Sequence, residues 1–282
     1  MTKKIALLHP GEMGVTVGAS LLNSGTSVAW VSHGRSKATQ RRADEAGFTT
    51  YDSFEKLLKE CTVVVSVCPP SAAVSTAVKV AATEFNGVYV DANAVSQNTA
   101  ARIAAIVETT GASYVDGSII GPPAHRHGTT RLYLSGVRVR EILELFLDSA
   151  IEAIDIGESR TAASALKMCY AAWTKGSSAL LISVGALAKS ANVDEVLYTE
   201  WNRSIPDLHA RLENASNSNA VKAWRFEGEM HEIADTFKAH GLTDDFFHAA
   251  ARTYSLLSKY KDTDRTPNLD DVLRTMLGFE DS

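Results

Sequence analysis

The first fourteen residues place the strongest constraint on the fold of this chain. Residues 5–8 (Ile-Ala-Leu-Leu) form a short apolar run, and a turn with glycines at positions 11 and 14 follows it directly. Residues 13–24 then carry apolar side chains at helical spacing, and Gly25 stands where such a helix would end. A buried strand that enters a helix through a glycine turn begins a β-α-β unit, so we expect a parallel sheet covered by helices.

The same alternation continues to about residue 157. Further strands are predicted at 27–31, 62–67, 87–90, 113–115 and 131–135, with helices between them, for example at 53–60, 71–83 and 98–109. Strand signals then stop, and helices are predicted at 159–191, 193–203, 205–215, 219–240 and 243–260. The polar run 214–219 is predicted to be a turn between two of these helices. We therefore expect an α/β protein with a doubly wound domain at residues 1–157 and an all-α domain at residues 158–282.

The glycine turn is a candidate dinucleotide site. It matches the second and third glycines of G-x-G-x-x-G at Gly11 and Gly14, while His9 occupies the first position and has no evident role. Gly11 lets the backbone approach a diphosphate, and Gly14 lets the helix pack closely on the strand. The helix N-terminus adds amide donors and partial positive charge. We predict a Rossmann domain that binds its cofactor at Gly11, Glu12, Met13 and Gly14; a glycine turn without a ligand is the alternative.

The end of the second predicted strand favours NADP(H) over NAD. NAD-binding domains usually place a carboxylate there for the ribose 2′-hydroxyl, but this chain has none before Asp44. Ser32, Arg35 and Lys37 stand in its place, and a guanidinium suits the geometry of a phosphate. We therefore predict that these three residues bind the 2′-phosphate. A solvated surface charge is the alternative interpretation of Arg35.

Two later strand ends are predicted to reach the same crevice, because ligands of open α/β sheets bind beyond the carboxyl ends of the strands. Cys68 and Pro69 follow one strand, and Asp91 and Asn93 follow the next. We predict that Cys68, Pro69 and Asn93 contact the cofactor, with Asn93 near the nicotinamide. Pro69 is equally explicable as a loop stiffener, and Asp91 as a hydrogen-bond anchor within its loop.

Composition excludes several other classes of function. The net charge of −5 gives no general attraction to nucleic acid or to acidic membranes. The N-terminal apolar run is too short for a signal peptide or a membrane span, so we expect a cytoplasmic protein. Cys61, Cys68 and Cys169 lie in apolar stretches whose spacing suits neither a disulfide framework nor a metal site. We predict buried free thiols and no metal.

Beyond these patterns, the chain resembles the β-hydroxyacid dehydrogenase superfamily. The glycine turn with Met13, the Val-Cys-Pro-Pro sequence at 67–70, the segment 116–123 (Asp-Gly-Ser-Ile-Ile-Gly-Pro-Pro) and Lys167 come in the order of that superfamily. The resemblance covers nearly the whole chain and is most specific in its N-terminal part. It is closest to a branch with a 6-phosphogluconate dehydrogenase-like NAD-binding domain and a divergent C-terminal domain. The 3-hydroxyisobutyrate dehydrogenases and imine reductases are relatives.

The resemblance implies that Lys167 is the catalytic acid/base. Transfer of a hydride to a carbonyl leaves an alkoxide that must be protonated, and the reverse reaction requires removal of the hydroxyl proton. Lys167 is surrounded by apolar helix residues, and desolvation lowers the pKa of a lysine toward the working pH. The alternative is a helix lysine with its ammonium in water. Lys175 is the second candidate.

The resemblance also implies a substrate site formed by Ser118, Ile120, Gly121, Tyr170 and His231. Gly121 matches a family glycine at which the backbone meets a substrate carboxylate, and Tyr170 stands where the family carries a substrate-binding asparagine. His231 falls near a family lysine that contacts substrate. Ile120 replaces a common serine, so we expect a more apolar pocket than that of the relatives.

These residues support one leading hypothesis and two alternatives. The leading hypothesis is NADP-dependent interconversion of an alcohol and a carbonyl group in a small substrate that bears an acid group. The alternatives are an imine reductase, which acts on C=N, and a non-catalytic NADP-binding protein. Because imine reductases usually replace the lysine, Lys167 favours the alcohol/carbonyl pair. The resemblance further implies a homodimer formed through the all-α domain.

Overall fold

The computed structural model describes residues 3–261, 263 and 265–279. Their contacts divide the chain into two compact units, Met1–Met168 and Cys169–Ser282. Within the described residues, no helix combines the length and the apolar composition that a membrane span requires.

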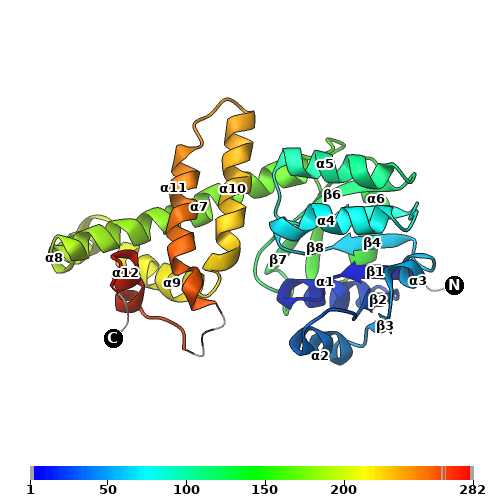
Figure 1. The fold of residues 1–282 in the computed structure, drawn as a ribbon, viewed down its shortest axis with the longest axis horizontal. Helices are drawn as coiled ribbons and strands as arrows, with labels where there is room; N and C mark the ends of the chain where they lie inside the picture. The colour runs from blue at the N-terminus through cyan, green and yellow to red at the C-terminus, as the bar shows by residue number, and fades with distance from the viewer. Residues whose placement is uncertain (1–2, 262, 264, 280–282) are drawn as a thin grey trace. The chain divides into compact units, whose positions relative to one another are not determined.

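The first unit contains one sheet of eight strands in the order β3-β2-β1-β4-β5-β6-β7-β8 (Figure 1). The first six strands in sequence pair in parallel, β7 runs antiparallel to β6, and β8 is parallel to β7. The order 3-2-1-4-5-6 is that of a Rossmann domain. The strands are β1 (Lys4–Leu8), β2 (Ser27–Val31), β3 (Thr49–Tyr51), β4 (Val63–Ser66), β5 (Val88–Asp91), β6 (Ser113–Ile120), β7 (Thr130–Ser135) and β8 (Ile151–Asp155).

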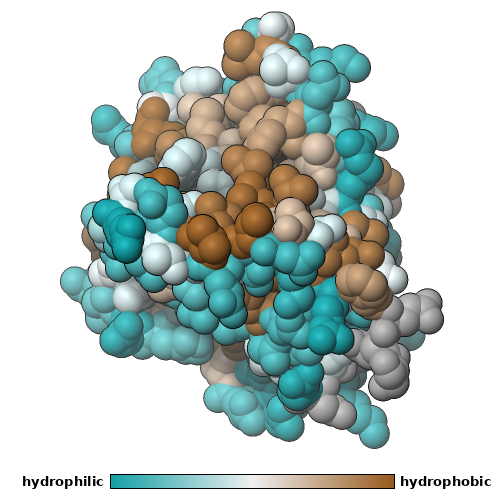
Figure 2. All heavy atoms as spheres, turned by 90° about the vertical axis from the view of Figure 1, so that its left-hand side faces the viewer, coloured by the Kyte–Doolittle hydropathy of each residue, from teal (hydrophilic) through white to brown (hydrophobic). Residues whose placement is uncertain are grey.

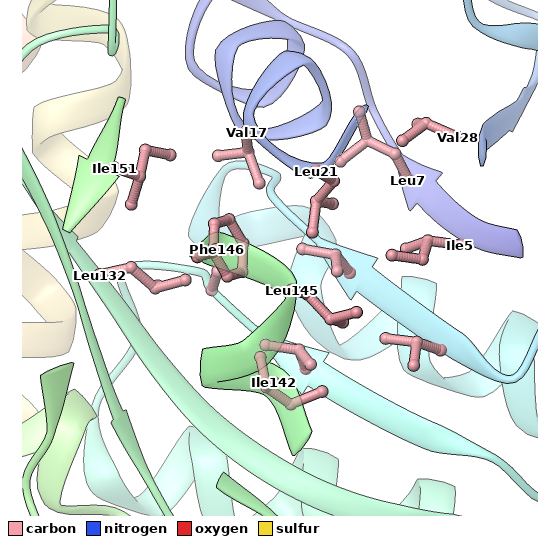
Figure 3. Packing of buried hydrophobic residues seen from close by; sticks show 14 of the residues in the cluster. Ile5, Leu7, Val17, Leu21, Val28, Leu132, Ile142, Leu145, Phe146 and Ile151 are labelled. Carbon is pink, nitrogen blue, oxygen red and sulfur yellow. The ribbon is translucent and has the colours of Figure 1, made fainter. Parts of the chain in front are cut away.

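Helices cover both faces of this sheet because the central strands are apolar on both sides. Ile5 and Leu7 of β1 pack on one face with Val17 and Leu21 of α1, as Figure 3 shows. Ala6 and Leu8 face the opposite cluster, which α3, α4 and α5 cover. The helices of this unit are α1 (Glu12–Asn23), α2 (Lys37–Glu45), α3 (Phe54–Leu58), α4 (Pro70–Ala81), α5 (Gln97–Glu108), α6 (Val139–Leu143) and the 3-10 turn η1 (Glu144–Phe146).

The second unit is helical. In its core, Phe226 and Tyr254 pack edge to face with ring centroids 5.3 Å apart, which joins α10 to α11. The helix α7 begins in the first unit and continues through the second. The helices are α7 (Ala162–Ser190), α8 (Asp194–Ser204), α9 (Leu208–Ala220), α10 (Ala223–Ala239), α11 (Asp245–Leu257), η2 (Ser258–Tyr260) and α12 (Leu269–Met276).

The predicted fold class is confirmed, with local corrections. The sheet is mixed, not wholly parallel, because β7 turns back along β6. The strands β3 and β8 and the helix α12 were not predicted. The run 214–219 lies inside α9, so the prediction of a turn there is wrong. The predicted boundary at Gly157 precedes α7, whereas the contact division falls at Met168, because the first residues of α7 pack with the sheet.

Candidate functional site

The turn between β1 and α1 is built around a close backbone approach. His9 has a φ of 84°, and its carbonyl oxygen accepts a hydrogen bond of 2.8 Å from the N–H of Gly11. A Cβ atom on Gly14 would lie 2.2 Å from the same His9 oxygen. Gly14 is therefore required by sterics, which explains the last glycine of the motif.

The N-terminus of α1 offers unused donors. Gly11 is the N-cap, and no side chain among the described residues caps this helix. The first intrahelical bond runs from the N–H of Val15 to the Gly11 carbonyl at 2.9 Å, so the N–H groups of Glu12, Met13 and Gly14 have no intrahelical acceptor. A Cβ on Gly11 would meet nothing within 4 Å. Open space above a helix N-terminus with free amides fits the diphosphate of a dinucleotide.

The loop after β2 brings Arg35 to the end of that strand. The N–H of Arg35 donates to the Ser32 carbonyl at 3.1 Å, and Gly34 completes the turn with a φ of 73°. Arg35 is half-buried, burial lowers its pKa, and no carboxylate among the described residues pairs with it. Lys37 is exposed at the start of α2. This loop therefore presents a partly desolvated cation with no protein anion beside it, as a phosphate site requires.

The loops after β4 and β5 are joined by the side chain of Asn93. Its Oδ1 accepts from the Cys68 N–H at 2.6 Å, while Nδ2 donates to Ser66 Oγ at 3.1 Å and to Asp91 Oδ1 at 2.6 Å. Since these bonds engage both ends of the buried amide, Asn93 holds the Cys68–Pro69 loop in place. Cys68 is half-buried, and burial raises its pKa to about 11, so it is a neutral thiol at pH 7.

A second set of polar residues anchors the start of α7 to the sheet. Asp116 of β6 accepts from the N–H of Ser164 at 2.7 Å and from its hydroxyl at 2.6 Å. Ser135 of β7 accepts from the N–H of Ala163 at 3.1 Å, and the Ser118 hydroxyl donates to the Ala163 carbonyl. A carboxylate at a helix N-terminus satisfies orphan amides and complements the helix dipole. The first turn of α7 is thus fixed to β6 and β7.

Asp91 and Asp116 are linked through the hydroxyl of Tyr114. This hydroxyl lies 3.2 Å from Asp91 Oδ2 and 3.5 Å from Asp116 Oδ1. Burial raises the pKa of Asp116 to about 6. Burial, and then the charge of Asp116, raise the pKa of Asp91 to about 7. The pair therefore holds protons at a pH where exposed carboxyl groups have lost theirs.

Lys167 lies one turn after this anchor. Its Nζ donates to the carbonyl oxygen of Ile119 at 2.7 Å, so the ammonium of this half-buried residue is held against the end of β6. Gly121, two residues after Ile119, has a φ of 128°, and a Cβ there would lie 2.3 Å from the Thr129 carbonyl oxygen. Lys167 and the turn at Gly121 thus lie at the same end of β6.

Other predicted substrate residues are placed differently. The prediction for Ser118 needs correction, because its side chain is fully buried and its hydroxyl bonds to α7. The side chain of Ile120 is also buried. Tyr170 and His231 are exposed side chains of the second unit. Their contact with substrate stays a prediction.

Two further predictions concern Lys175 and the thiols. Lys175 forms a largely buried ion pair with Glu229, and the Tyr254 hydroxyl donates to its carbonyl at 2.8 Å, which indicates a structural role within the helical unit. Of the three predicted buried thiols, Cys61 is buried, Cys68 is half-buried and Cys169 is exposed. The prediction is therefore wrong for Cys169.

Sequence reasoning missed the α7 anchor. Asp116, Ser135 and Ser164 are far apart in the chain, and the signal available in the sequence was an acidic residue within a mainly apolar predicted strand. It also left His9 without a role, although a histidine in a position that favours glycine was visible in the motif.

Two family models match the chain. Residues 4–142 match the NAD binding domain of 6-phosphogluconate dehydrogenase. Residues 188–257 match a domain of unknown function, DUF1932. The first match contains the glycine turn, the Arg35 loop and Asp116, and the second lies within the helical unit.

Individual proteins extend this similarity over most of the chain. An uncharacterized 28.5 kDa protein from Methanothermus fervidus is 29% identical over 197 residues, which are 69% of this chain and 74% of that protein. A conserved protein of unknown function, described as structurally similar to 3-hydroxyacid dehydrogenases, is 25% identical with a TM-score of 0.67, covering 91% of this chain and 97% of its own. The 3-hydroxyisobutyrate dehydrogenase of Mycobacterium tuberculosis shares the fold at 19% identity, with a TM-score of 0.70 and coverage of 98% and 99%. Imine reductases and reductive aminases share it as well.

Proposed function

Because residues 4–142 belong to the family of NAD binding domains of 6-phosphogluconate dehydrogenase and are followed by a DUF1932 domain, we propose that this chain is an NADP-dependent oxidoreductase. Its reaction is the interconversion of an alcohol and a carbonyl group in a small substrate that bears an acid group. The dinucleotide, when bound, supplies or accepts the hydride. The free amides of α1, from Glu12 to Gly14, would hold its diphosphate.

The observation that carries the proposal is the position of Lys167. Its Nζ bonds to Ile119 at the end of β6, two residues before Gly121, where the family resemblance implies contact with a substrate carboxylate. The carbonyl partner fixes the position of the ammonium at this strand end, and a positioned side chain of this kind can transfer a proton to or from a substrate. Lys167 protonates the substrate oxygen during reduction and removes its proton during oxidation. Proton transfer by a positioned side chain typically contributes ~10²–10⁴ in rate.

The preference for NADP rests on the loop after β2. Arg35 is half-buried without a carboxylate partner among the described residues, and the strand end carries Ser32 where NAD-binding domains place an acidic residue. A ribose 2′-phosphate supplies the missing anion, and the planar guanidinium matches its geometry.

The test of the proposed chemistry uses substitutions of Lys167. We expect Lys167→Ala to lower kcat/KM by ~10²-fold or more with NADPH and 3-oxo acid substrates, while NADPH binding persists. Lys189→Ala is the matched control, because Lys189 lies on the same helix in an ion pair with Asp270. Full activity of Lys167→Ala on every accepted substrate contradicts the lysine mechanism.

The same assay separates the two alternative functions. A panel of cyclic imines accompanies the carbonyl panel, with NADPH oxidation as the common readout. If only the imines are turned over, the proposed alcohol/carbonyl reaction is wrong and the protein is an imine reductase. Tight NADPH binding without turnover on either panel would indicate a non-catalytic protein.

We also propose that two copies of the chain associate through α7. Trp173, Leu180 and Leu187 are 70%, 52% and 69% exposed and recur every seven residues, which places them on one face of the helix. Figure 2 views the side on which α8 lies in Figure 1 and shows hydrophobic atoms gathered into a connected patch with hydrophilic atoms around it. A two-fold interface uses the same surface patch on both copies, so this stripe would pack against its own counterpart.

A further inference from the structure

His9 is the one residue of the glycine turn that the cofactor motif does not explain. It occupies the position of the first glycine and has a φ of 84°, in the left-handed region. A residue with a Cβ is disfavoured there, whereas glycine adopts this conformation freely. Strain that persists at a binding turn suggests that the side chain has a use.

The strand register places His9 near the predicted 2′-phosphate site. Ala6 of β1 pairs with Ala29 of β2, so continuing the register sets His9 beside Ser32 at the carboxyl ends of the two strands. Arg35 folds back onto Ser32 through its N–H bond of 3.1 Å. The charge of Arg35 acts on the His9 ring, so the ring lies within electrostatic reach of the unpaired guanidinium.

The His9 ring also has an unmet polar requirement. Its Nδ1 is buried and has no hydrogen-bond partner among the described residues. Burial, and then the charges of Arg35 and Lys79, lower the pKa of His9 to about 4, while the Leu8 carbonyl opposes this change. The nearby Cys68 thiol is neutral at pH 7, so it provides no anion.

We propose that His9 belongs to the 2′-phosphate site and takes up a proton when NADP binds. This inference rests on the proposed preference for NADP. Without cofactor, His9 stays neutral beside the Arg35 cation. A phosphate dianion reverses the local field, favours the imidazolium and accepts a charge-assisted hydrogen bond from it. NAD carries an uncharged hydroxyl at this position and leaves His9 neutral.

The proposal makes NADP affinity depend on pH in a way that NAD affinity does not. Because the proton is taken up on binding, NADP⁺ binds more tightly as the pH falls from 8 to 7. The phosphate's own ionisation, near pH 6, weakens binding at lower pH and is the same for every variant of the protein.

The test is calorimetric titration at pH 7 in two buffers of different ionisation enthalpy, with NADP⁺ and NAD⁺ as ligands. His9→Asn is the test variant, because asparagine tolerates the left-handed region and does not titrate. His33→Asn is the matched control, since His33 is an exposed histidine of the adjacent loop. We expect His9→Asn to lose the proton uptake and to bind NADP⁺ about tenfold more weakly, with NAD⁺ affinity within twofold of the wild type. The melting temperature should not fall.

Three results would overturn the inference. In the first, His9→Asn takes up as many protons with NADP⁺ as the wild type. In the second, it weakens both dinucleotides equally, which assigns His9 to the shape of the turn. In both cases the wild type still binds NADP⁺, so the proposed function stands. In the third, the wild type binds neither dinucleotide, and both proposals fail.

Discussion

Replacing Asp116 by asparagine tests the buried carboxylate that fixes α7. The amide keeps the shape of the carboxyl group and resembles its protonated form, since one end can accept from the Ser164 N–H and the other can donate to the Ser164 hydroxyl. The variant therefore separates the shape of the anchor from its charge.

The magnitude follows from the pKa of Asp116, which burial raises from 3.8 to about 6. Between these two pH values the native state binds more protons than the unfolded state, so the free energy of unfolding decreases as the pH rises. The stabilisation that protonated Asp116 contributes is lost above about pH 6. The difference, 6 − 3.8 = 2.2, corresponds at about 1.36 kcal/mol per tenfold change in proton affinity to roughly 3 kcal/mol. Asp91 contributes in the same direction up to about pH 7.

The expected result is a wild-type protein that is less stable at pH 8 than at pH 5. Relative to the wild type, Asp116→Asn should gain about 1.4 kcal/mol between pH 5 and pH 8, or ~3–6 °C in melting temperature for a unit of this size, because only the part of the loss between pH 5 and about pH 6 lies in this range. The assay is scanning calorimetry between pH 5 and 8. Asp155→Asn is the control, because Asp155 is an exposed carboxylate that accepts one backbone N–H, from Gly157.

The reasoning is refuted by either of two outcomes. One is a melting-temperature difference between Asp116→Asn and the wild type that does not increase from pH 5 to pH 8. The other is an Asp116→Asn protein that is less stable than the wild type at pH 8, which would mean that the charged carboxylate is the favoured form of the anchor.

Three further predictions concern the other parts of the site. Asp116→Ala removes the acceptors of the Ser164 N–H and hydroxyl, so the start of α7 is held less firmly. We expect kcat to fall about tenfold at unchanged NADPH affinity. A kcat equal to that of the wild type would show that the anchor does not position Lys167. Arg35→Ala should raise the Kd for NADPH ~10–100-fold and leave that for NADH within about threefold, whereas Arg41→Ala, at an exposed position of α2, should change neither. Leu180→Glu should convert a dimer to monomers in analytical ultracentrifugation, whereas Leu242→Glu, which is 57% exposed outside the α7 stripe, should not; a monomeric wild type contradicts the proposed dimer.

Local patterns made the Rossmann half of the fold predictable. The strand, turn and helix at residues 5–24 are short-range features, and alternating strands and helices restrict the topology of a sheet to few choices. The strand β8 was not predicted, because Glu152 and Asp155 interrupt its apolar residues at the sheet edge. Only the C-terminal part of α9 was missed, because its polar residues at 214–219 resemble a turn, whereas packing of the helical unit overrides that local preference.

The α7 anchor was not predictable from such patterns because its partners are distant in the chain. Asp116 and Ser164 are 48 residues apart, and their pairing depends on where α7 returns to the sheet. One part was accessible: Asp116 and Ser118 lie two residues apart on a strand, so their side chains share a face. This shared face of the strand predicts that Ser118 points toward the anchor and not toward a substrate.

The most direct test of the central claim is a titration of the protein with NADPH, followed by nucleotide fluorescence and calorimetry, with Gly11→Val as the paired variant. A Cβ atom at position 11 meets nothing within 4 Å, and the φ of −72° suits any residue, so we expect this variant to keep the wild-type melting temperature. We predict saturable binding by the wild type and its loss in Gly11→Val, because the valine fills the space assigned to the diphosphate. No fluorescence change and no heat with the wild type, or undiminished binding by Gly11→Val, would contradict the account.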